Sequence, residues 1–350
     1  MQLNRVPQLD GFRAAAVLLV IASHAGLGRL IPGGFGVTIF FFLSGYLITT
    51  LLRVEFGSTG QIDLKAFYFR RFLRIAPPLY ITLFIVNVAQ LRGWLGPGTD
   101  PKTYLWDYLF LSNYSHLWGQ EGGLPIPLWS LAVEEHFYML FPIAYALLAK
   151  RYPDTRIAKV CFGACLIILG FRLVPWILGN DLSRNYYWSH TRMDSILFGS
   201  ILATWQNPMI DRDAWIPKIG PLIAAIALLI ATFVIRNESF RQTIRYSLQG
   251  VSLFIIFSYA LHSKDRPFSR LLALPILAWV GSISYELYLC HVAIFKAVGH
   301  FRGDGWTSVV LGTIGAFAFA QLIRVLVEKP IIAWRRRHPK QVKSVVATAA

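Results

Sequence analysis

The sequence has few charged residues. Only 15% of its 350 residues are Asp, Glu, Lys or Arg, whereas a soluble domain of this size carries about 25%. Hydrophobic residues make up 55%, and the mean hydropathy is +0.50. A water-soluble core cannot hide this much apolar side chain, so lipid is the expected solvent for most of it. The shortage of charge therefore predicts a membrane protein.

Acidic residues are scarcer than basic ones, 18 against 34, which gives a formal net charge of +16. In a polar protein this excess would suggest binding to nucleic acid. Here the basic residues lie in short segments between apolar runs, the pattern that sets the orientation of a membrane protein. We therefore expect no nucleic-acid partner.

Cysteine is also rare: Cys161, Cys165 and Cys290 all lie in apolar stretches and form no CxxC pair. They are expected to be small buried hydrophobes. The sequence also lacks a P-loop, an HExxH zinc motif and a Gly-x-Ser-x-Gly elbow. A serine nucleophile is thus unsupported, and we expect no metal.

Long apolar segments predict an all-α, polytopic transmembrane helical bundle, because a span needs about 20 mainly apolar residues. The aromatic segment 103–118 is expected to be an interfacial helix. The first apolar segment is expected to be an uncleaved span, because the chain after it stays in the membrane. The ten predicted spans are 9–27, 35–52, 75–92, 127–149, 157–178, 191–206, 216–235, 246–262, 273–299 and 306–327.

Most Lys and Arg residues outside these segments fall on the side of the N-terminus, which predicts an N-in, C-in topology. Arg236, Arg241 and Arg245, in a predicted outer loop, run against this rule. We expect one transmembrane domain over 1–338. Residues 339–350 are expected to form a disordered cytoplasmic tail.

Two ionisable residues lie in the first predicted span, where they are costly and therefore candidates for function. Arg13 and His24 are eleven residues apart, about 1100° around a regular helix, so they would share one face about 16 Å apart along the axis. A neutral histidine can take a proton from a hydroxyl, and an arginine can hold a phosphate or polarise a carbonyl. The alternative is an interfacial anchor at Arg13 and a packing histidine at His24.

A cluster of three arginines, Arg70, Arg71 and Arg74, lies at the expected cytoplasmic end of the third span. Arg71 and Arg74, three residues apart, would share a helix face. Such a pair could grip a polyphosphate such as the diphosphate of coenzyme A. A positive-inside anchor is the alternative.

At the expected outer start of the fourth span, Ser130 and Glu134 are four residues apart and would face the same way. The carboxylate could orient a catalytic imidazole or bind substrate hydroxyls; an interfacial charge is the alternative.

Three further polar features lie in later spans. Arg192 and Asp194 could form one buried ion pair. Glu286 and His291 lie in the ninth span, where His291 is a candidate pocket residue or a structural one. Glu328-Lys329-Pro330 reads as the end of the last helix.

Taken in order, these motifs resemble the membrane-bound acyltransferase family 3, over about residues 7 to 335. The resemblance begins with Leu9-Asp10-Gly11-Phe12-Arg13, the spacing to His24, and the run from Gly36 to Ile48. Later blocks are Phe69-Arg70-Arg71-Phe72-Leu73-Arg74-Ile75-Ala76-Pro77, Trp129-Ser130-Leu131-x-Val133-Glu134-Glu135-x-Phe137-Tyr138, Arg192-Met193-Asp194, Ser284-Tyr285-x-Leu287-Tyr288-x-x-His291 and Glu328-Lys329-Pro330.

The resemblance implies a ten-helix bacterial inner-membrane enzyme. It would move an acyl group, usually acetyl, from cytoplasmic acyl-CoA to a hydroxyl, often of a surface glycan such as O-antigen or exopolysaccharide. By similarity Arg13 and His24 are essential to transfer, Arg71 and Arg74 are linked to CoA, and Glu134 matches the glutamate after Trp-Ser-Leu.

Two departures qualify the resemblance. Many relatives carry Gln where this chain has His136, and some fuse an esterase-like domain that is not expected here, which would leave acceptor recognition to the membrane bundle. Acylation of a small molecule such as a macrolide stays open. So does a transporter, which also uses intramembrane Arg, His and Glu, although no inverted repeat is visible in the sequence.

Overall fold

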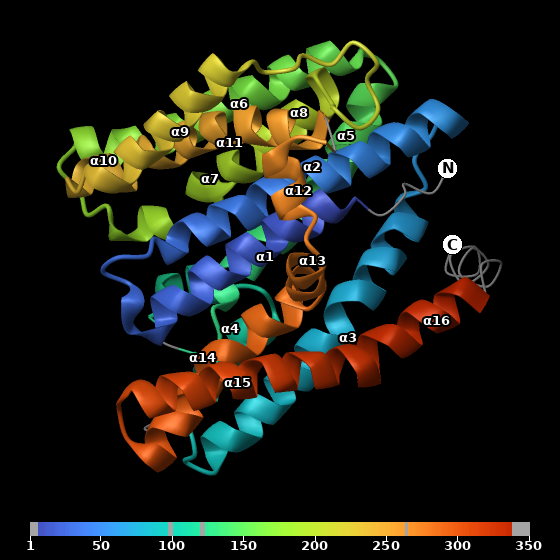
Figure 1. The fold of residues 1–350 in the computed structure, drawn as a ribbon. Coiled ribbons are helices and arrows are strands. Elements are labelled where there is room, and N and C mark those ends of the chain that lie inside the picture. Colours follow the sequence, from blue (N-terminus) through green and yellow to red (C-terminus); the bar gives the residue numbers. More distant parts are fainter. Residues whose placement is uncertain (1–5, 97–100, 120–122, 263–264, 338–350) are drawn as a thin grey trace. The chain divides into compact units, whose positions relative to one another are not determined.

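The computed structural model describes residues 6–96, 101–119, 123–262 and 265–337 (Figure 1). All regular secondary structure in these residues is helical, which confirms the all-α fold class. The chain divides into two compact units. Unit 1 comprises Met1–Val20, Ile31–Ile62 and Trp129–Ser282, and unit 2 comprises Ile21–Leu30, Asp63–Leu128 and Ile283–Ala350. The predicted tail, 339–350, lies outside the described residues.

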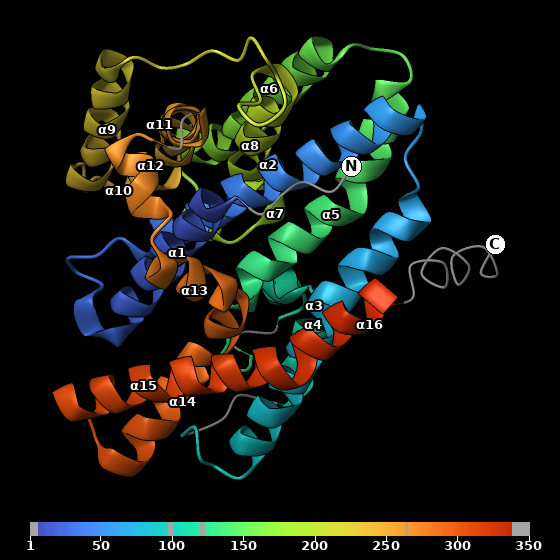
Figure 2. The same ribbon diagram turned by 45° about the vertical axis from the view of Figure 1, so that its right-hand side comes forward.

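Unit 1 is built around a short helix, α8 (Asp194–Trp205), almost all of whose residues are buried. It packs against α2 (Gly33–Thr59), α6 (Asp154–Ile177) and α11 (Arg245–His262), as Figures 1 and 2 show. The remaining helices of this unit are α1 (Pro7–Ala22) as far as Val20, α5 (Leu128–Ala149) from Trp129, α7 (Ser189–Arg192), α9 (Ile219–Val234), α10 (Glu238–Gln242), α12 (Pro267–Leu272), α13 (Pro275–Ser282) and the 3₁₀ turn Ser183–Tyr186.

The backbones of α2 and α8 touch at glycines. A Cβ added to Gly199 would lie 2.0 Å from the carbonyl oxygen of Phe42, and one added to Gly45 would lie 1.9 Å from that of Ile196. Close approach at small residues is how helices commonly associate in lipid, where there is little hydrophobic force between them. The two glycines therefore set the position of α8 against α2.

Polar side chains meet beyond the C-terminal end of α8. The amide of Asn207 donates to Thr50, and its carbonyl oxygen accepts a 2.7 Å hydrogen bond from the Tyr46 hydroxyl. One helical turn along α2, Arg53 forms a 2.8 Å ion pair with Asp211. These contacts satisfy the polar groups that follow the helix end, as the interior of a membrane protein requires.

Unit 2 contains the long helix α3 (Leu64–Leu91) and the pair α14 (Ser284–Arg302) and α15 (Trp306–Ile323). α14 and α15 lie side by side and are joined by a turn at Gly303–Gly305 (Figures 1 and 2). A π turn, Arg324–Glu328, leads from α15 into α16 (Lys329–Arg337), and another π turn, Ser23–Leu27, lies against α15.

The aromatic segment predicted as one interfacial helix is broken into short pieces instead. They are the 3₁₀ turns Pro101–Thr103 and Ser112–Trp118 and the helix α4 (Tyr104–Tyr108). The chain reverses between them, so that Trp106 stacks on Trp118 with ring centroids 4.3 Å apart. Ring packing of this kind favours a folded segment over a straight helix.

In the described residues, six helical segments are long and apolar enough to cross a membrane: Pro7–Leu27, Gly33–Thr59, Leu64–Leu91, Leu128–Ala149, Asp154–Ile177 and Trp306–Arg335. A seventh would combine α13 and α14, which are broken at Ile283. These segments correspond to seven of the ten predicted spans.

The other three predicted spans, 191–206, 216–235 and 246–262, are helical but do not qualify as spans by length and hydropathy. α8 has 12 residues and α9 has 16, about 18 Å and 24 Å of helix, against a hydrocarbon core of about 30 Å. α11 carries polar residues such as Gln249 and Ser258 along its length. Six or seven candidate spans are therefore observed, and ten spans with both termini inside stay a prediction.

One buried carboxyl lies outside the candidate spans. Asp107 in α4 is only 4% exposed, and it accepts a 2.8 Å hydrogen bond from the backbone N–H of Leu124. Burial raises the pKa of this carboxyl to about 7, against the opposing effect of the Leu124 hydrogen bond. The folded state therefore holds a proton here that the unfolded chain releases near pH 4.

The contact between α2 and α8 predicts an asymmetry between glycines. Gly199→Ala forces the two backbones apart, so we expect the protein to lose about 1–3 kcal/mol of stability, the usual cost of overpacking. Gly163→Ala on α6 is the matched control, because a Cβ there meets nothing within 4 Å and alanine favours a helix. Thermal unfolding in detergent should show a lower midpoint for the first variant only; equal midpoints would contradict the assigned contact.

Asp107 predicts a pH dependence of stability. Because its pKa is raised by folding, its contribution is fully present below about pH 4 and is lost as pH rises to about 7. The unfolding temperature of Asp107→Asn should therefore fall less steeply than that of the wild type between pH 5 and 8. The control is Asp181→Asn: hydrogen bonds from Ser183 lower the pKa of this exposed carboxyl, so its slope over this range should match the wild type. An Asp107→Asn slope equal to that of the wild type would refute the assignment.

Candidate functional site

The first arginine candidate, Arg13, is neutralised locally. Its guanidinium donates to the carboxylate of Asp10, one turn earlier in α1, at 2.8 Å. The backbone at Asp10 is held by Gly281, where an added Cβ would lie 1.9 Å from the Asp10 carbonyl oxygen. In the sequence, Asp10 is recognisable only as a member of the motif that runs from Leu9 to Arg13. Its ion pair orients the Arg13 guanidinium within unit 1.

The candidate base, His24, lies in the π turn that follows α1, in unit 2. The regular helix ends at Ala22, and Ala25 and Gly26 have non-helical backbone angles. The helical spacing that places Arg13 and His24 on one face assumes a regular helix as far as residue 24, two residues beyond the end of α1. Since the two residues also fall in different units, their shared face stays a prediction.

Unit 2 brings His24 together with a second sequence candidate, His291 of α14. The His291 Nε2 lies 3.2 Å from the His24 Nδ1, and the ring centroids are 5.0 Å apart. The His291 side chain is fully buried, whereas His24 is exposed at the surface of the unit. The His24 imidazole thus has a buried polar partner at its Nδ1 while the residue itself is exposed.

A cavity of about 400 Å³ opens beside His24 within unit 2. It is lined by the π turn, by the last part of α14 and by the first turn of α15. Polar lining comes from His24, Asp304 and Ser308, and apolar lining from Phe295 and Trp306. A cavity with a few polar groups in an apolar wall is the usual form of a small-molecule site.

Helix α14 connects the histidine pair to the arginine cluster. The Tyr285 hydroxyl donates to the carbonyl oxygen of Ile75, which directly follows Arg74 in α3. Six residues separate Tyr285 from His291, about 9 Å along the helix axis. Glu286, the other sequence candidate on α14, is buried and lies among the charged groups of Arg74, Arg324 and Glu328.

The three arginines of the cluster lie on α3, which begins eleven residues before the predicted span. The Asp63 side chain caps this helix by accepting the Ala66 N–H at 2.9 Å. Residues 64–74 are therefore helical, and Arg71 and Arg74 share a face as expected. Arg70 and Arg71 are half-buried and Arg74 is exposed.

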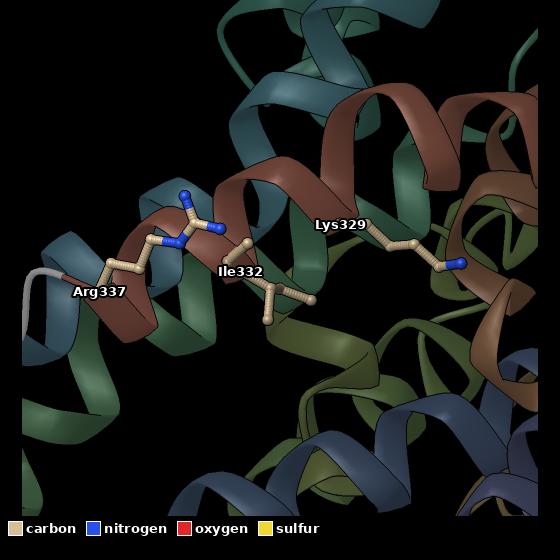
Figure 3. Close-up of a pocket in the computed structure, with 4 residues that line it drawn as sticks. Lys329, Ile332 and Arg337 are labelled. Carbon is tan, nitrogen blue, oxygen red and sulfur yellow. The ribbon is translucent and has the colours of Figure 1, made fainter.

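A second cavity of unit 2, of about 410 Å³, lies along α16. Figure 3 shows Lys329 and Arg337 on either side of Ile332 on this helix. Arg335 on the same helix is close enough to Arg70 for the two charges to repel. Cationic side chains of α3 and α16 thus gather in one region of unit 2, which favours an anionic ligand.

In unit 1, Glu134 of α5 accepts a 2.9 Å hydrogen bond from the Tyr138 hydroxyl, one turn later. Ser130, one turn before Glu134, is buried. His136, at which the sequence departs from the family that it resembles, lies with its Nδ1 2.7 Å from the Ser189 hydroxyl oxygen. A glutamine side chain can also make a hydrogen bond to a hydroxyl, so the departure at His136 keeps the polar character of the position.

The predicted ion pair between Arg192 and Asp194 is not what forms. Asp194 pairs instead with Arg172 of α6 in a bidentate contact at 2.9 and 2.6 Å, and all side-chain atoms of both residues are buried. Ser247 donates to the same carboxylate at 2.9 Å. Arginine and aspartate two residues apart on α7 and α8 point in different directions, which the local sequence does not reveal.

Arg192 is held by aromatic rings. Its guanidinium lies 3.6 Å from the ring centroid of Tyr246 and also near Phe41 and Tyr186. It donates to Thr38 at 3.2 Å, and no carboxylate among the described residues pairs with it. Cation–π contacts of this kind are strongest when desolvated, so Arg192 has a structural explanation within unit 1.

Each unit thus gathers its own share of the predicted site. Unit 1 holds Arg13, Ser130, Glu134, Arg192 and Asp194, and unit 2 holds His24, Arg70, Arg71, Arg74, Glu286 and His291. Among the described residues, no three His, Cys, Asp or Glu side chains gather in a way that could hold a metal ion. Chemically, unit 2 offers an imidazole at a cavity and a cationic region formed by side chains of α3 and α16.

Comparison with known proteins places these features in a family. The family profile described as the acyltransferase domain matches residues 6–325. No solved structure matches the chain.

Three proteins named as O-acetyltransferases are similar in sequence to this chain. A protein of Staphylococcus aureus (strain COL), provisionally named an O-acetyltransferase, is 32% identical over 94% of this chain and 58% of its own length. The peptidoglycan O-acetyltransferase OatA of Listeria monocytogenes is 30% identical over 93% of this chain and 56% of its length. The O-acetyltransferase OatA of Staphylococcus aureus (strain NCTC 8325 / PS 47) is 30% identical over 93% and 57%.

The chain spans less than two thirds of the length of these relatives. The family profile, in contrast, covers nearly all of the chain and includes most residues of both units. The arginine and histidine of the first segment, the arginine pair of α3 and His291 of α14 all lie within the matched range. This chain belongs to acyltransferase family 3.

Proposed function

We propose that this protein is a membrane O-acetyltransferase that transfers an acetyl group from cytoplasmic acetyl-CoA to a hydroxyl of a cell-wall or cell-surface glycan. The observation that carries the proposal is the His24 imidazole, which lines a cavity in unit 2 of a family 3 acyltransferase. The relative named as a peptidoglycan O-acetyltransferase favours a cell-wall glycan as the acceptor over O-antigen or an exopolysaccharide.

In this proposal His24 is the general base. Its imidazole takes the proton of the acceptor hydroxyl as the oxygen attacks the thioester carbonyl carbon of the donor. The carbon–sulfur bond then breaks, and the proton passes from the imidazolium to the leaving thiolate. The products are the acetyl ester and free CoA, so the step is balanced without a metal or an acyl-enzyme.

The donor would be held by Arg71 and Arg74, with Arg70 beside them. Guanidinium groups bind phosphate through paired, charge-assisted hydrogen bonds, and the cations of α16 add positive potential to the same region. Because the Tyr285–Ile75 hydrogen bond ties the arginine end of α3 to α14, the acyl arm of the donor would follow α14 toward the histidine pair.

Arg13 and Glu134 lie in unit 1, and their parts in the transfer are proposed from the resemblance. The guanidinium of Arg13, which is paired with Asp10, is of the kind that can polarise a carbonyl or hold a phosphate. Glu134, with Tyr138, could accept hydrogen bonds from acceptor hydroxyls. We further propose a bacterial cytoplasmic membrane location, ten spans and both termini inside, which would place the arginine cluster on the side of cytoplasmic acyl-CoA.

The proposed function predicts that His24 is needed for acetyl transfer. Membranes containing the wild-type chain, labelled acetyl-CoA and a soluble peptidoglycan fragment should yield labelled ester and free CoA. His24→Ala should lower this transfer by about 10²–10⁴-fold, the usual contribution of a general base, at unchanged amounts of folded protein. A folded His24→Ala protein with wild-type activity would remove His24 from the mechanism. Movement of the fragment across the membrane without covalent change would identify a transporter instead.

The proposed function also predicts that Arg71 contributes to binding of the donor. Arg71→Ala should raise the KM for acetyl-CoA by about 10- to 100-fold, the loss expected for a hydrogen bond between charged groups, with a smaller effect on kcat. Arg151→Ala, at an exposed arginine after α5, is the matched control and should leave KM unchanged. An unaltered KM in Arg71→Ala would exclude this arginine from CoA binding.

A further inference from the structure

The hydrogen bonds of His291 determine which of its nitrogens carries a proton. Its Nδ1 lies 3.0 Å from the carbonyl oxygen of Leu287 and 2.9 Å from that of Tyr288. Carbonyl oxygens only accept hydrogen bonds, so the His291 Nδ1 must be the donor and must carry hydrogen. The tautomer of this buried ring is therefore fixed by the backbone of its own helix.

The other nitrogen of His291 is then an acceptor. A ring protonated on both nitrogens would place a full charge on a side chain with no exposed surface. Its ring neighbours are Tyr288 and Phe295, and no described carboxylate forms an ion pair with it. An isolated charge in such surroundings is costly, so the neutral ring presents the lone pair of its Nε2 to His24.

The partner atom, 3.2 Å away, is the His24 Nδ1. Since the His291 Nε2 accepts, the His24 Nδ1 must donate, and a neutral imidazole holds only one ring hydrogen. The lone pair of His24 then resides on its Nε2, on the opposite side of the ring from His291. This is the nitrogen that could take a proton.

The backbone at His24 makes such a partner necessary. Ala25 and Gly26, directly after it, leave the helix, and Gly26 has a φ of +96°. A side chain next to irregular backbone is not held by the packing of a regular helix turn, and His24 lies at the surface of its unit. The bond to a buried, doubly anchored ring supplies the orientation that the local chain does not.

We propose that His291 is a positioning residue: it holds His24 in the tautomer that bears hydrogen on Nδ1, so that Nε2 is the nitrogen that deprotonates the acceptor hydroxyl. The role rests on the proposed function of His24 as the base. As His24 takes up the proton and becomes positively charged, the neutral His291 Nε2 accepts a stronger hydrogen bond without adding a second charge. The Leu287 and Tyr288 carbonyl dipoles strengthen the His291 ring as an acceptor.

Two substitutions at His291 test separately the contacts of its Nδ1 with the helix backbone and of its Nε2 with His24. The amide group of asparagine reaches about as far as the histidine Nδ1, so His291→Asn keeps a donor for the Leu287 and Tyr288 carbonyl oxygens but loses contact with His24. The glutamine amide reaches about as far as Nε2, so His291→Gln can offer a carbonyl oxygen to the His24 Nδ1–H. The pair therefore distinguishes helix anchoring from the alignment of His24.

The test combines ¹⁵N NMR of the histidine rings with acetyl transfer, on the full chain in lipid nanodiscs. The His24 signals are those absent from His24→Ala. In the wild type we expect His24 to carry hydrogen on Nδ1, and in His291→Asn a mixture of both tautomers. The kcat should fall by about 100-fold in His291→Asn and by less than about 10-fold in His291→Gln, within the range of general-base effects, at unchanged KM for acetyl-CoA.

Three outcomes would overturn the proposal: hydrogen on the His24 Nε2 in the wild type, wild-type kcat in His291→Asn, or an equal loss in both variants, which would mark a purely structural residue. The wild-type spectrum decides the question even if both variants unfold. Full activity of His24→Ala would overturn the proposed function instead, and the spectrum would still show whether His291 sets the His24 tautomer.

Discussion

Lipid offers no hydrogen bonds, so each polar group inside this protein must find its partner in the protein itself. This constraint explains the all-helical backbone, in which hydrogen bonds close within each segment. It also explains how the buried charges are arranged. Arg172 and Asp194 meet in a bidentate pair completed by Ser247, Arg192 is surrounded by aromatic faces, and Arg53 lies between Asp154 and Asp211.

The same constraint distinguishes polar residues that stabilise the fold from polar residues that are candidates for catalysis. Around α8 in unit 1, buried polar groups such as Asp194 and Asn207 find their partners in neighbouring side chains, and these contacts account for their presence. In unit 2 the polar chain of Leu287, Tyr288, His291 and His24 runs from a buried backbone to the edge of a cavity. A reactive side chain needs such support, because the hydrogen bond with the buried His291 orients the His24 ring at the cavity.

Much of the fold follows from the sequence, and the parts that do not have identifiable causes. The apolar runs predict the helices, since hydropathy is a local property. They do not show which helices are long enough to span, because apolar residues buried inside the protein, as in α8, look the same in sequence as residues facing lipid. The start of α3 depends on one capping side chain, Asp63, whose role is visible in the sequence only as a weak signal.

Some residues of the candidate site can likewise be predicted from the sequence, and others cannot. Residues such as Arg13 and His24 are recognisable because ionisable groups are rare in apolar segments. Their partners are not: Asp10 is near Arg13 in sequence, but Arg172 lies 22 positions before Asp194, and His291 lies 267 positions after His24. Pairing over such separations is decided by how the helices pack, which neither spacing nor composition specifies. The motif around His291 could signal a polar residue in the ninth span, but not which residue it contacts.

The short helix α8 has a consequence for where charge can lie in the membrane. Polar clusters lie at both of its ends, Arg172 and Asp194 at the first and Asn207 with Tyr46 and Thr50 at the second. The helix between them is about 18 Å long, much less than the hydrocarbon thickness of about 30 Å. Because α8 is almost entirely buried by protein, neighbouring helices and not lipid lie against it. Charged and polar groups can therefore lie closer to the bilayer midplane beside α8 than a helix facing lipid would allow.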